Sequence, residues 1–218
     1  MMRRIDNILS DEGFCSELDK IGHYEADRIY CRHDLNHLLD VARIAYIHAL
    51  EENSGLDKEL IYAAALLHDI GRAAQYESGI PHDRAGAAIA ADILAVCGFN
   101  EEEAEVILYA VTGHRGGAEA SEVSANDAGA AKASEVPANS AGGAEASEVP
   151  TTDAGSGAKD FVDDKVVSET AFDVYKTDRE ALRRIIKLAD DESRLCFKCR
   201  AWDSCKWNEA RKNKELKI

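Results

Sequence analysis

The stretch that decides the fold of this chain is DKELIYAAALLHDIGR, residues 57–72. Asp57 can cap the first turn of a helix here, and Gly71 is a stop signal at the other end. This helix carries His68 near its end, in line with apolar residues that face the interior, and Asp69 follows directly. Histidine and aspartate are both common metal ligands. The end of this helix is therefore a candidate metal site.

Further helices are predicted on both sides of this stretch, over residues 33–52, 82–97, 101–114 and 178–193. The first of them is apolar nearly all round, which is typical of a buried helix. Asn100 with Glu103, and Thr177 with Glu180, are capping-box pairs that predict where the last two begin. Strand signals are limited to the short run FDVY, residues 172–175. The predicted fold class is therefore all-α.

Short turns between these helices bring polar side chains to one end of the predicted bundle. A turn at 53–56 makes the first two helices antiparallel, and a turn at 97–100 does the same for the next two. Burying several histidines and carboxylates together without a cation would be costly. The sequence therefore predicts a metal-binding cluster of His37, His68, Asp69, His82, His114 and Asp190.

The segments around these residues resemble the HD superfamily of metal-dependent phosphohydrolases. They are HLLDVARIAY, ALLHDIGR, PHDRAGAAIA, VTGHRGG and KLADDESR, and the resemblance runs from about residue 30 to 195. It implies an all-α HD-domain helical bundle, which we assign to residues 1–115 plus 160–195. It further implies one ion held by His37, His68, Asp69 and Asp190, and a second held by His82 and His114.

In that implied arrangement Asp69 bridges the two ions and is the catalytic carboxylate. Asp190 is followed by DESR where the family more usually has a lysine-led stretch, and Asp191 is the alternative ligand. His33, one helical turn before His37, is either a supporting residue, an alternative ligand or a surface histidine. Imidazole and carboxylate ligands suit iron or manganese, with zinc and cobalt as alternatives.

Two such ions about 3.5–4 Å apart can activate water and polarise a phosphoryl oxygen. We therefore expect an enzyme that hydrolyses a phosphoester or phosphoanhydride of a nucleotide-like small molecule. Arg72, Arg84 and Arg115 each lie close in sequence to a predicted ligand and are candidate substrate-binding residues. One alternative is a mixed-valent diiron oxygenase of the same superfamily, which shares the ligand set. The other is a non-catalytic metal-binding HD domain, which would predict a damaged ligand set, whereas all six residues are present here.

Residues 116–159 differ in composition from the rest of the chain. They contain no aromatic residue, leucine or isoleucine, and ASEV recurs at residues 120, 133 and 146. Such a segment cannot bury a core, so we predict a long disordered insert. The net charge of the chain is −15, which provides no general attraction for a nucleic acid polymer. No long apolar run or secretory signal occurs, so we expect a cytoplasmic protein that acts on a small phosphorylated molecule without a membrane partner.

A second cluster of potential ligands lies in the C-terminal tail, residues 196–218. Cys196, Cys199 and Cys205 have the spacing C-x2-C-x5-C, one ligand short of a tetrahedral zinc site. Cys31 can supply the fourth thiolate if the tail folds back onto the domain. The alternative is a set of reduced thiols in a small apolar tail.

Overall fold

The computed structural model describes residues 2–113 and 164–217, with side chains from Asp178 onward in the second range. The predicted insert 116–159, together with His114 and Arg115, lies outside the described residues. The elements are α1 (Arg3–Ser10), α2 (Glu12–Tyr24), α3 (Leu35–Glu51), α4 (Lys58–Leu67), α5 (Arg72–Ser78), α6 (His82–Cys97), α7 (Glu101–Gly113), α8 (Asp164–Ser193) and the 3₁₀ turn η1 (Cys196–Lys198). Every regular element in the described ranges is helical, which confirms the all-α class.

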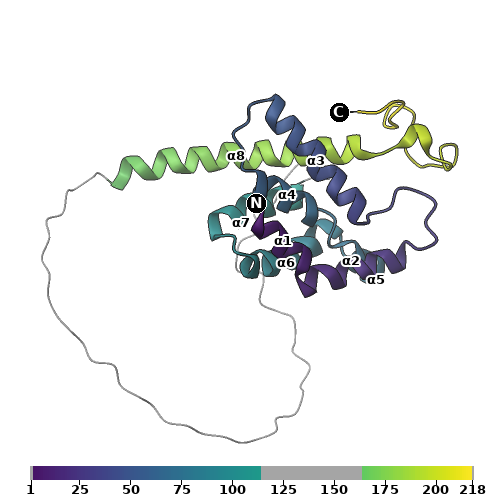
Figure 1. The fold of residues 1–218 in the computed structure, drawn as a ribbon, viewed down its shortest axis with the longest axis horizontal. Coiled ribbons are helices and arrows are strands. Elements are labelled where there is room, and N and C mark those ends of the chain that lie inside the picture. Colours follow the sequence, from purple (N-terminus) through teal and green to yellow (C-terminus); the bar gives the residue numbers. More distant parts are fainter. Residues whose placement is uncertain (1, 114–163, 218) are drawn as a thin grey trace, which may run out of the picture.

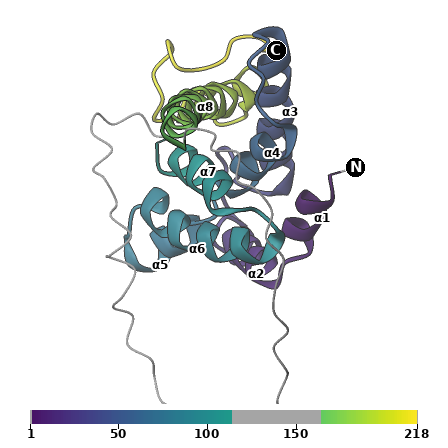
Figure 2. The same cartoon turned by 90° about the vertical axis from the view of Figure 1, so that its left-hand side faces the viewer.

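Helix α4 lies in the middle of the bundle because it is apolar on every side. Its residues from Ala63 to Leu67 are all buried. α3 packs against α4 and α8, and α7 packs against α4, α6 and α8. Figure 2 shows α3 and α8 on one side of the layer formed by α4 and α7, and α2, α5 and α6 on the other. Residues on both sides of the predicted insert therefore belong to one bundle (Figure 1).

The predicted caps define the helices that carry the site. The Asp57 side chain accepts the backbone N–H groups of Glu59 and Leu60, and so starts α4 as predicted. Asn100 and Glu103 form the reciprocal capping box at the start of α7, each side chain accepting the other residue's backbone N–H at 2.9 to 3.0 Å. These caps satisfy helix N–H groups that have no partner within the helix.

The predicted start of the last helix at Thr177 is wrong. α8 begins at Asp164, so Thr177, Glu180 and the FDVY run all lie inside it. No glycine or proline occurs between Asp164 and Ser193 that would end a helix. The Glu180 side chain accepts a hydrogen bond from the Tyr109 hydroxyl of α7 instead of capping α8. The short helix α5 between the HDIG turn and His82 was also not predicted.

A glycine contact places α6 beside the end of α4. Gly71 lies so close to α6 that a Cβ atom there would be 2.2 Å from the carbonyl oxygen of His82 and 2.4 Å from the backbone nitrogen of Gly86. Only the missing side chain permits this approach, which fixes the position of His82.

None of the helices in the described ranges is long and apolar enough to cross a membrane.

Candidate metal centre

The end of α4 carries the predicted His68–Asp69 pair into the interior of the bundle. His68 ends α4 and Asp69 begins the tight turn to α5, and both are buried. His37 lies in the first turn of α3, whose N-cap Asp34 accepts the backbone N–H of His37 at 3.0 Å. Because α3 and α4 are antiparallel neighbours, His37 and His68 lie at the same end of the pair, as the turn between them predicted.

Four of the predicted ligands converge at this point. His68 Nε2 is 3.3 Å from Asp69 Oδ2 and 3.9 Å from Asp190 Oδ1. His37 Nε2 is 3.8 Å from Asp69 Oδ2 and 3.5 Å from Asp190 Oδ1. One ligand atom each from His37, His68 and Asp69 all lie within 4.8 Å of one another. These three residues can hold a metal ion, and Asp190 faces two of them from α8.

Asp69 also faces residues on its other side. His82 Nε2 is 3.2 Å from Asp69 Oδ1, the oxygen opposite the one that faces His37 and His68. The Arg72 Nε–H donates a hydrogen bond to the same Oδ1 at 2.8 Å. The two oxygens of this carboxylate therefore point toward two separate groups of side chains.

Each histidine at the site is held through its Nδ1 atom by an acceptor. His68 Nδ1 donates to the carbonyl oxygen of Ala65 at 2.7 Å, and His82 Nδ1 donates to Gln75 Oε1 at 2.6 Å. Ser193 donates its own hydroxyl proton to the Asp190 carbonyl, so its oxygen accepts from His37 Nδ1 at 3.4 Å. With a ring proton on Nδ1, Nε2 is the atom of each imidazole that faces the carboxylates, and it would present its lone pair to a metal ion bound between them. This orientation is typical of metal-binding histidines.

His33, whose role the sequence left open, lies beside the same histidine–aspartate cluster. It is buried, its Nε2 is 3.7 Å from Asp69 Oδ2, and its Nδ1 lies 2.6 Å from Glu25 Oε1. Glu25 is itself buried and also accepts the Tyr76 hydroxyl at 2.5 Å. Although burial opposes ionisation, hydrogen bonds from His33 and Tyr76 lower the pKa of Glu25 to about 2. Sequence reasoning missed Glu25, because only the tertiary fold brings the end of α2 to this place.

The carboxylates and imidazoles influence one another's protonation strongly. Burial, together with the charge of nearby His68, lowers the pKa of His37 to about 4. Burial alone would also lower the pKa of His68, but the Asp69 and Asp190 carboxylates raise it to about 9. The pKa of Asp69 lies well below its usual value because protonated His68 and Arg72 outweigh the cost of burial. The buried Asp69 carboxylate is thus stabilised by a cation nearby, which a proton on His68 or a metal ion can supply.

Stability of the chelator-treated protein should therefore fall at alkaline pH. The folded-state pKa of His68, about 9, lies above its ordinary value of 6.5. The proton stabilises the folded protein fully below pH 6.5, and this contribution is lost as the pH rises through 9. We expect the melting temperature in chelator to decline over this interval, but much less when manganese replaces the proton. Equal declines with and without manganese, measured by thermal unfolding, would argue against a shared cation position.

The other residues that the sequence predicted as ligands or substrate contacts lie at different distances from this cluster. Asp191, the alternative ligand, points elsewhere and pairs with Lys187 at 3.3 Å and Arg194 at 2.7 Å. Arg72 contacts the site through Asp69, whereas Arg84 is exposed in the first turn of α6. Cys31, Cys196, Cys199 and Cys205 all line one cavity near the end of α8. His114 and Arg115 follow α7 directly, outside the described residues.

The bundle and its buried histidine–aspartate cluster define a helical domain whose interior residues could hold a metal ion. The chain belongs to the HD-domain family, whose model, described as "HD domain", matches residues 34–195. An uncharacterized protein of Clostridium beijerinckii is 32% identical over 212 residues, which is 97% of each chain. No solved structure matches the chain.

Enzymes named ribonuclease Y match only the part around the site. That of Enterococcus faecalis is 36% identical over 94 residues, or 43% of this chain and 16% of the enzyme. That of Clostridium tetani is 32% identical over 117 residues, or 53% of this chain and 20% of the enzyme. The chain thus spans about a fifth or less of the length of these two relatives.

Proposed function

We propose that this HD-domain protein is a metal-dependent phosphohydrolase that uses two divalent ions on either side of Asp69. The observation that carries the proposal is the position of Asp69, whose two oxygens face His37 and His68 on one side and His82 on the other. A buried carboxylate placed between imidazole groups is suited to bridge two cations. His114, one residue after α7, is the proposed second ligand beside His82.

The residues present fit such a metal site. His37 Nε2 is buried and has no hydrogen-bond partner among the described residues, although it faces two carboxylates. Leaving a buried imidazole nitrogen without a partner is costly unless a cation binds there. Nitrogen and oxygen ligands together favour iron or manganese, with zinc or cobalt as alternatives. When bound, such ions supply a Lewis acid and neutralise charge that develops on a phosphoryl group.

The residues of the chain itself perform the positioning. Ala65, Gln75 and Ser193 fix the ring orientations of His68, His82 and His37, so little reorganisation is needed at the site. The Arg72 side chain is about one-fifth exposed while it holds Asp69, and so can also contact a substrate phosphate. We assign the same role to the exposed Arg84.

We propose a small nucleotide-like phosphoester or phosphoanhydride as the substrate, rather than a nucleic acid polymer. The ribonuclease Y similarity is confined to a small part of those enzymes. The net charge of −15 also opposes the binding of a long polyanion. The few local arginines are sufficient for one or two phosphate groups.

A substrate panel tests this function. Protein loaded anaerobically with iron or manganese should hydrolyse a dinucleoside polyphosphate, a cyclic dinucleotide or a simple phosphomonoester, with product measured by chromatography. Faster cleavage of an oligoribonucleotide at physiological salt would instead identify a nuclease. Failure to cleave any phosphoester, combined with oxygen consumption in the presence of a polyol or aminophosphonate, would identify the diiron oxygenase.

A further inference from the structure

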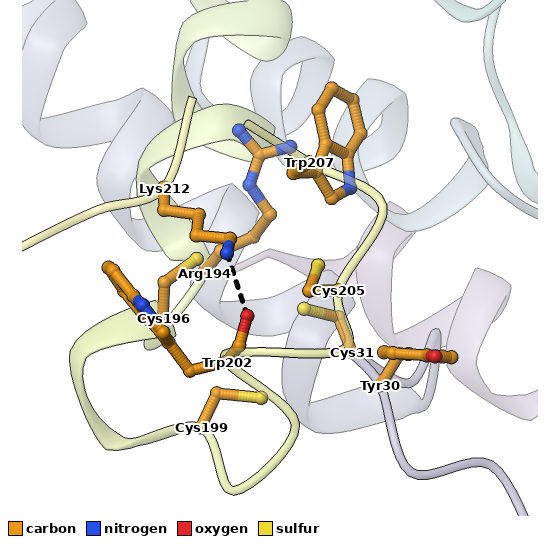
Figure 3. A pocket seen from close by; sticks show the side chains of 9 residues that line it. All are labelled: Tyr30, Cys31, Arg194, Cys196, Cys199, Trp202, Cys205, Trp207 and Lys212. Atoms are coloured by element: carbon orange, nitrogen blue, oxygen red, sulfur yellow. Dashed lines mark hydrogen bonds between the residues drawn. The ribbon is translucent and has the colours of Figure 1, made fainter. Parts of the chain in front are cut away.

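Four cysteines from two distant parts of the chain surround one cavity beside the end of α8. Cys31 lies in the loop between α2 and α3, whereas Cys196, Cys199 and Cys205 follow α8. Figure 3 shows the four side chains around the same space. The cavity has a volume of about 20 Å³, which is room for one species the size of a water molecule.

Successive turns of the backbone curl the tail around this cavity. The Cys199 N–H donates to the Cys196 carbonyl at 3.0 Å, the Trp202 N–H to the Cys199 carbonyl at 3.3 Å, and the Cys205 N–H to the Trp202 carbonyl at 3.4 Å. The Tyr30 hydroxyl donates to the Ser204 carbonyl at 3.2 Å, which joins the loop that carries Cys31 to the tail. Three backbone turns and one hydrogen bond between the loop and the tail thus place the thiols on several sides of the cavity.

The tail is also fastened to the end of α8. The Asn213 side-chain amide donates to the carbonyl oxygens of Asp191, Glu192 and Arg194 at 2.8 to 3.2 Å. Carbonyl groups in the last turn of a helix have no partner within the helix. Asn213 donates to two carbonyl groups of this turn and to that of Arg194 just beyond it, and so joins the tail to the end of α8.

Positive side chains line the same cavity. Arg194 and Lys212 both belong to its wall, and Lys212 Nζ donates to the Trp202 carbonyl at 2.7 Å. Burial raises the pKa of the Cys31 thiol, with Cys196 and Cys199 raising it further, whereas Arg194 lowers it. Because the four cysteines line one small cavity, they would repel one another if they were thiolates. A divalent cation would remove that repulsion, and the two basic residues would balance the remaining negative charge.

We propose that Cys31, Cys196, Cys199 and Cys205 bind one structural zinc ion. Four thiolates with a C-x2-C pair are a typical tetrahedral zinc ligand set, and the cavity is of single-ion size. No three of the four sulfur atoms lie within 4.8 Å of one another in this structure, so binding draws the thiols inward. The family match ends at residue 195, before the three tail cysteines, so this site is separate from the centre at Asp69.

The zinc ion would join the tail to the segment that positions His33. Cys31 lies two residues before His33, whose ring is held between Glu25 and Asp69. Fixing Cys31 therefore restricts movement of the loop at the edge of the metal centre. The zinc site acts as a structural support for that centre without taking part in its chemistry.

Metal analysis of the full chain under reducing conditions tests the proposal. The variant Asp69→Ala, which lacks the main metal centre, is expected to keep one zinc ion per chain. Adding Cys199→Ser or Cys205→Ser should remove it, whereas Cys15→Ser and Cys97→Ser, at cysteines outside the cavity, should not. Cobalt in place of zinc should give thiolate-to-cobalt absorption that disappears in the same variants.

A second measurement covers the case in which a cysteine variant fails to fold. Titration of the Asp69→Ala protein with a mercurial reagent should release its zinc as the cavity thiols react. The proposal is overturned if this protein lacks zinc and gives no thiolate–cobalt absorption. It is equally overturned if the four cysteines form disulfides under reducing conditions, or if an iron–sulfur chromophore accounts for them.

Discussion

Asp69→Ala is expected to lower the proposed phosphohydrolase activity severely and to remove metal from the proposed centre at Asp69. Asp69 is buried, and its two oxygens lie 3.2 to 3.8 Å from the Nε2 atoms of four histidines. A catalytic metal ion contributes several kcal/mol of charge stabilisation. Loss of about 4 kcal/mol corresponds to a roughly 10³-fold lower kcat/KM. Metal content by mass spectrometry and steady-state hydrolysis of the best substrate measure both effects.

The neighbouring pair Asp190 and Asp191 provides a matched control for ligand identity. Asp190 faces His37 and His68, whereas Asp191 pairs with Lys187 and Arg194, away from these histidines. Asp190→Ala should lower metal content and activity, while Asp191→Ala should keep both close to the wild-type values. Full metal occupancy of the HD centre in Asp69→Ala would show that this carboxylate does not join the two groups of histidines.

Gly71→Ala is expected to produce the largest loss of stability from a single added methyl group. The new Cβ atom would lie 2.2 to 2.9 Å from backbone atoms of His82 and Gly86, which no side-chain rotation can relieve. Adding a methylene to a packed core typically costs 1–3 kcal/mol. Because backbone must move here, we expect about 3 kcal/mol or more in urea unfolding. We also expect weaker metal binding, since α6 would carry His82 away from Asp69.

Gly22→Ala is the matched control for this substitution. Gly22 lies inside α2, and a Cβ atom there would meet no other atom within 4 Å. The variant should be slightly more stable than wild type, by roughly 0.5–1 kcal/mol, because alanine favours a helix more than glycine does. If Gly71→Ala also retains wild-type stability and metal content, α5 and α6 do not approach as closely as the structure indicates.

The sequence was most informative where a local physical rule acts alone. Asp57 and the Asn100–Glu103 box start their helices as predicted, because capping involves only neighbouring backbone groups. The Thr177–Glu180 pair follows the same pattern but lies inside α8. Residues 164–176 contain no helix breaker, and helices on both sides of a potential cap can merge into one when nothing stops the first. A cap pattern therefore shows where a helix can begin, not where it must.

The metal centre shows the same division between local and tertiary information. Helix length and antiparallel turns were enough to place His37 beside His68, and an inward-facing stripe was enough to place Asp190 near both. The residues that orient the rings could not be predicted in this way. Glu25, Gln75 and Ser193 come from three different elements, and common polar residues of this kind give no signal until the fold brings them to a histidine.

The sequence by itself thus determined the helical class and the order of the residues that we predict as metal ligands. The helical class follows from periodicity and capping, which act over a few turns of helix, whereas the predicted ligand set also rests on the resemblance to the HD superfamily. Only the tertiary structure decided that the His33 ring lies between Glu25 and Asp69. It also decided that Asp191 points away from the site and that Cys31 shares a cavity with the tail. Each of these depends on how separate helices and loops pack, because interatomic contacts over long sequence distances are set by the whole core.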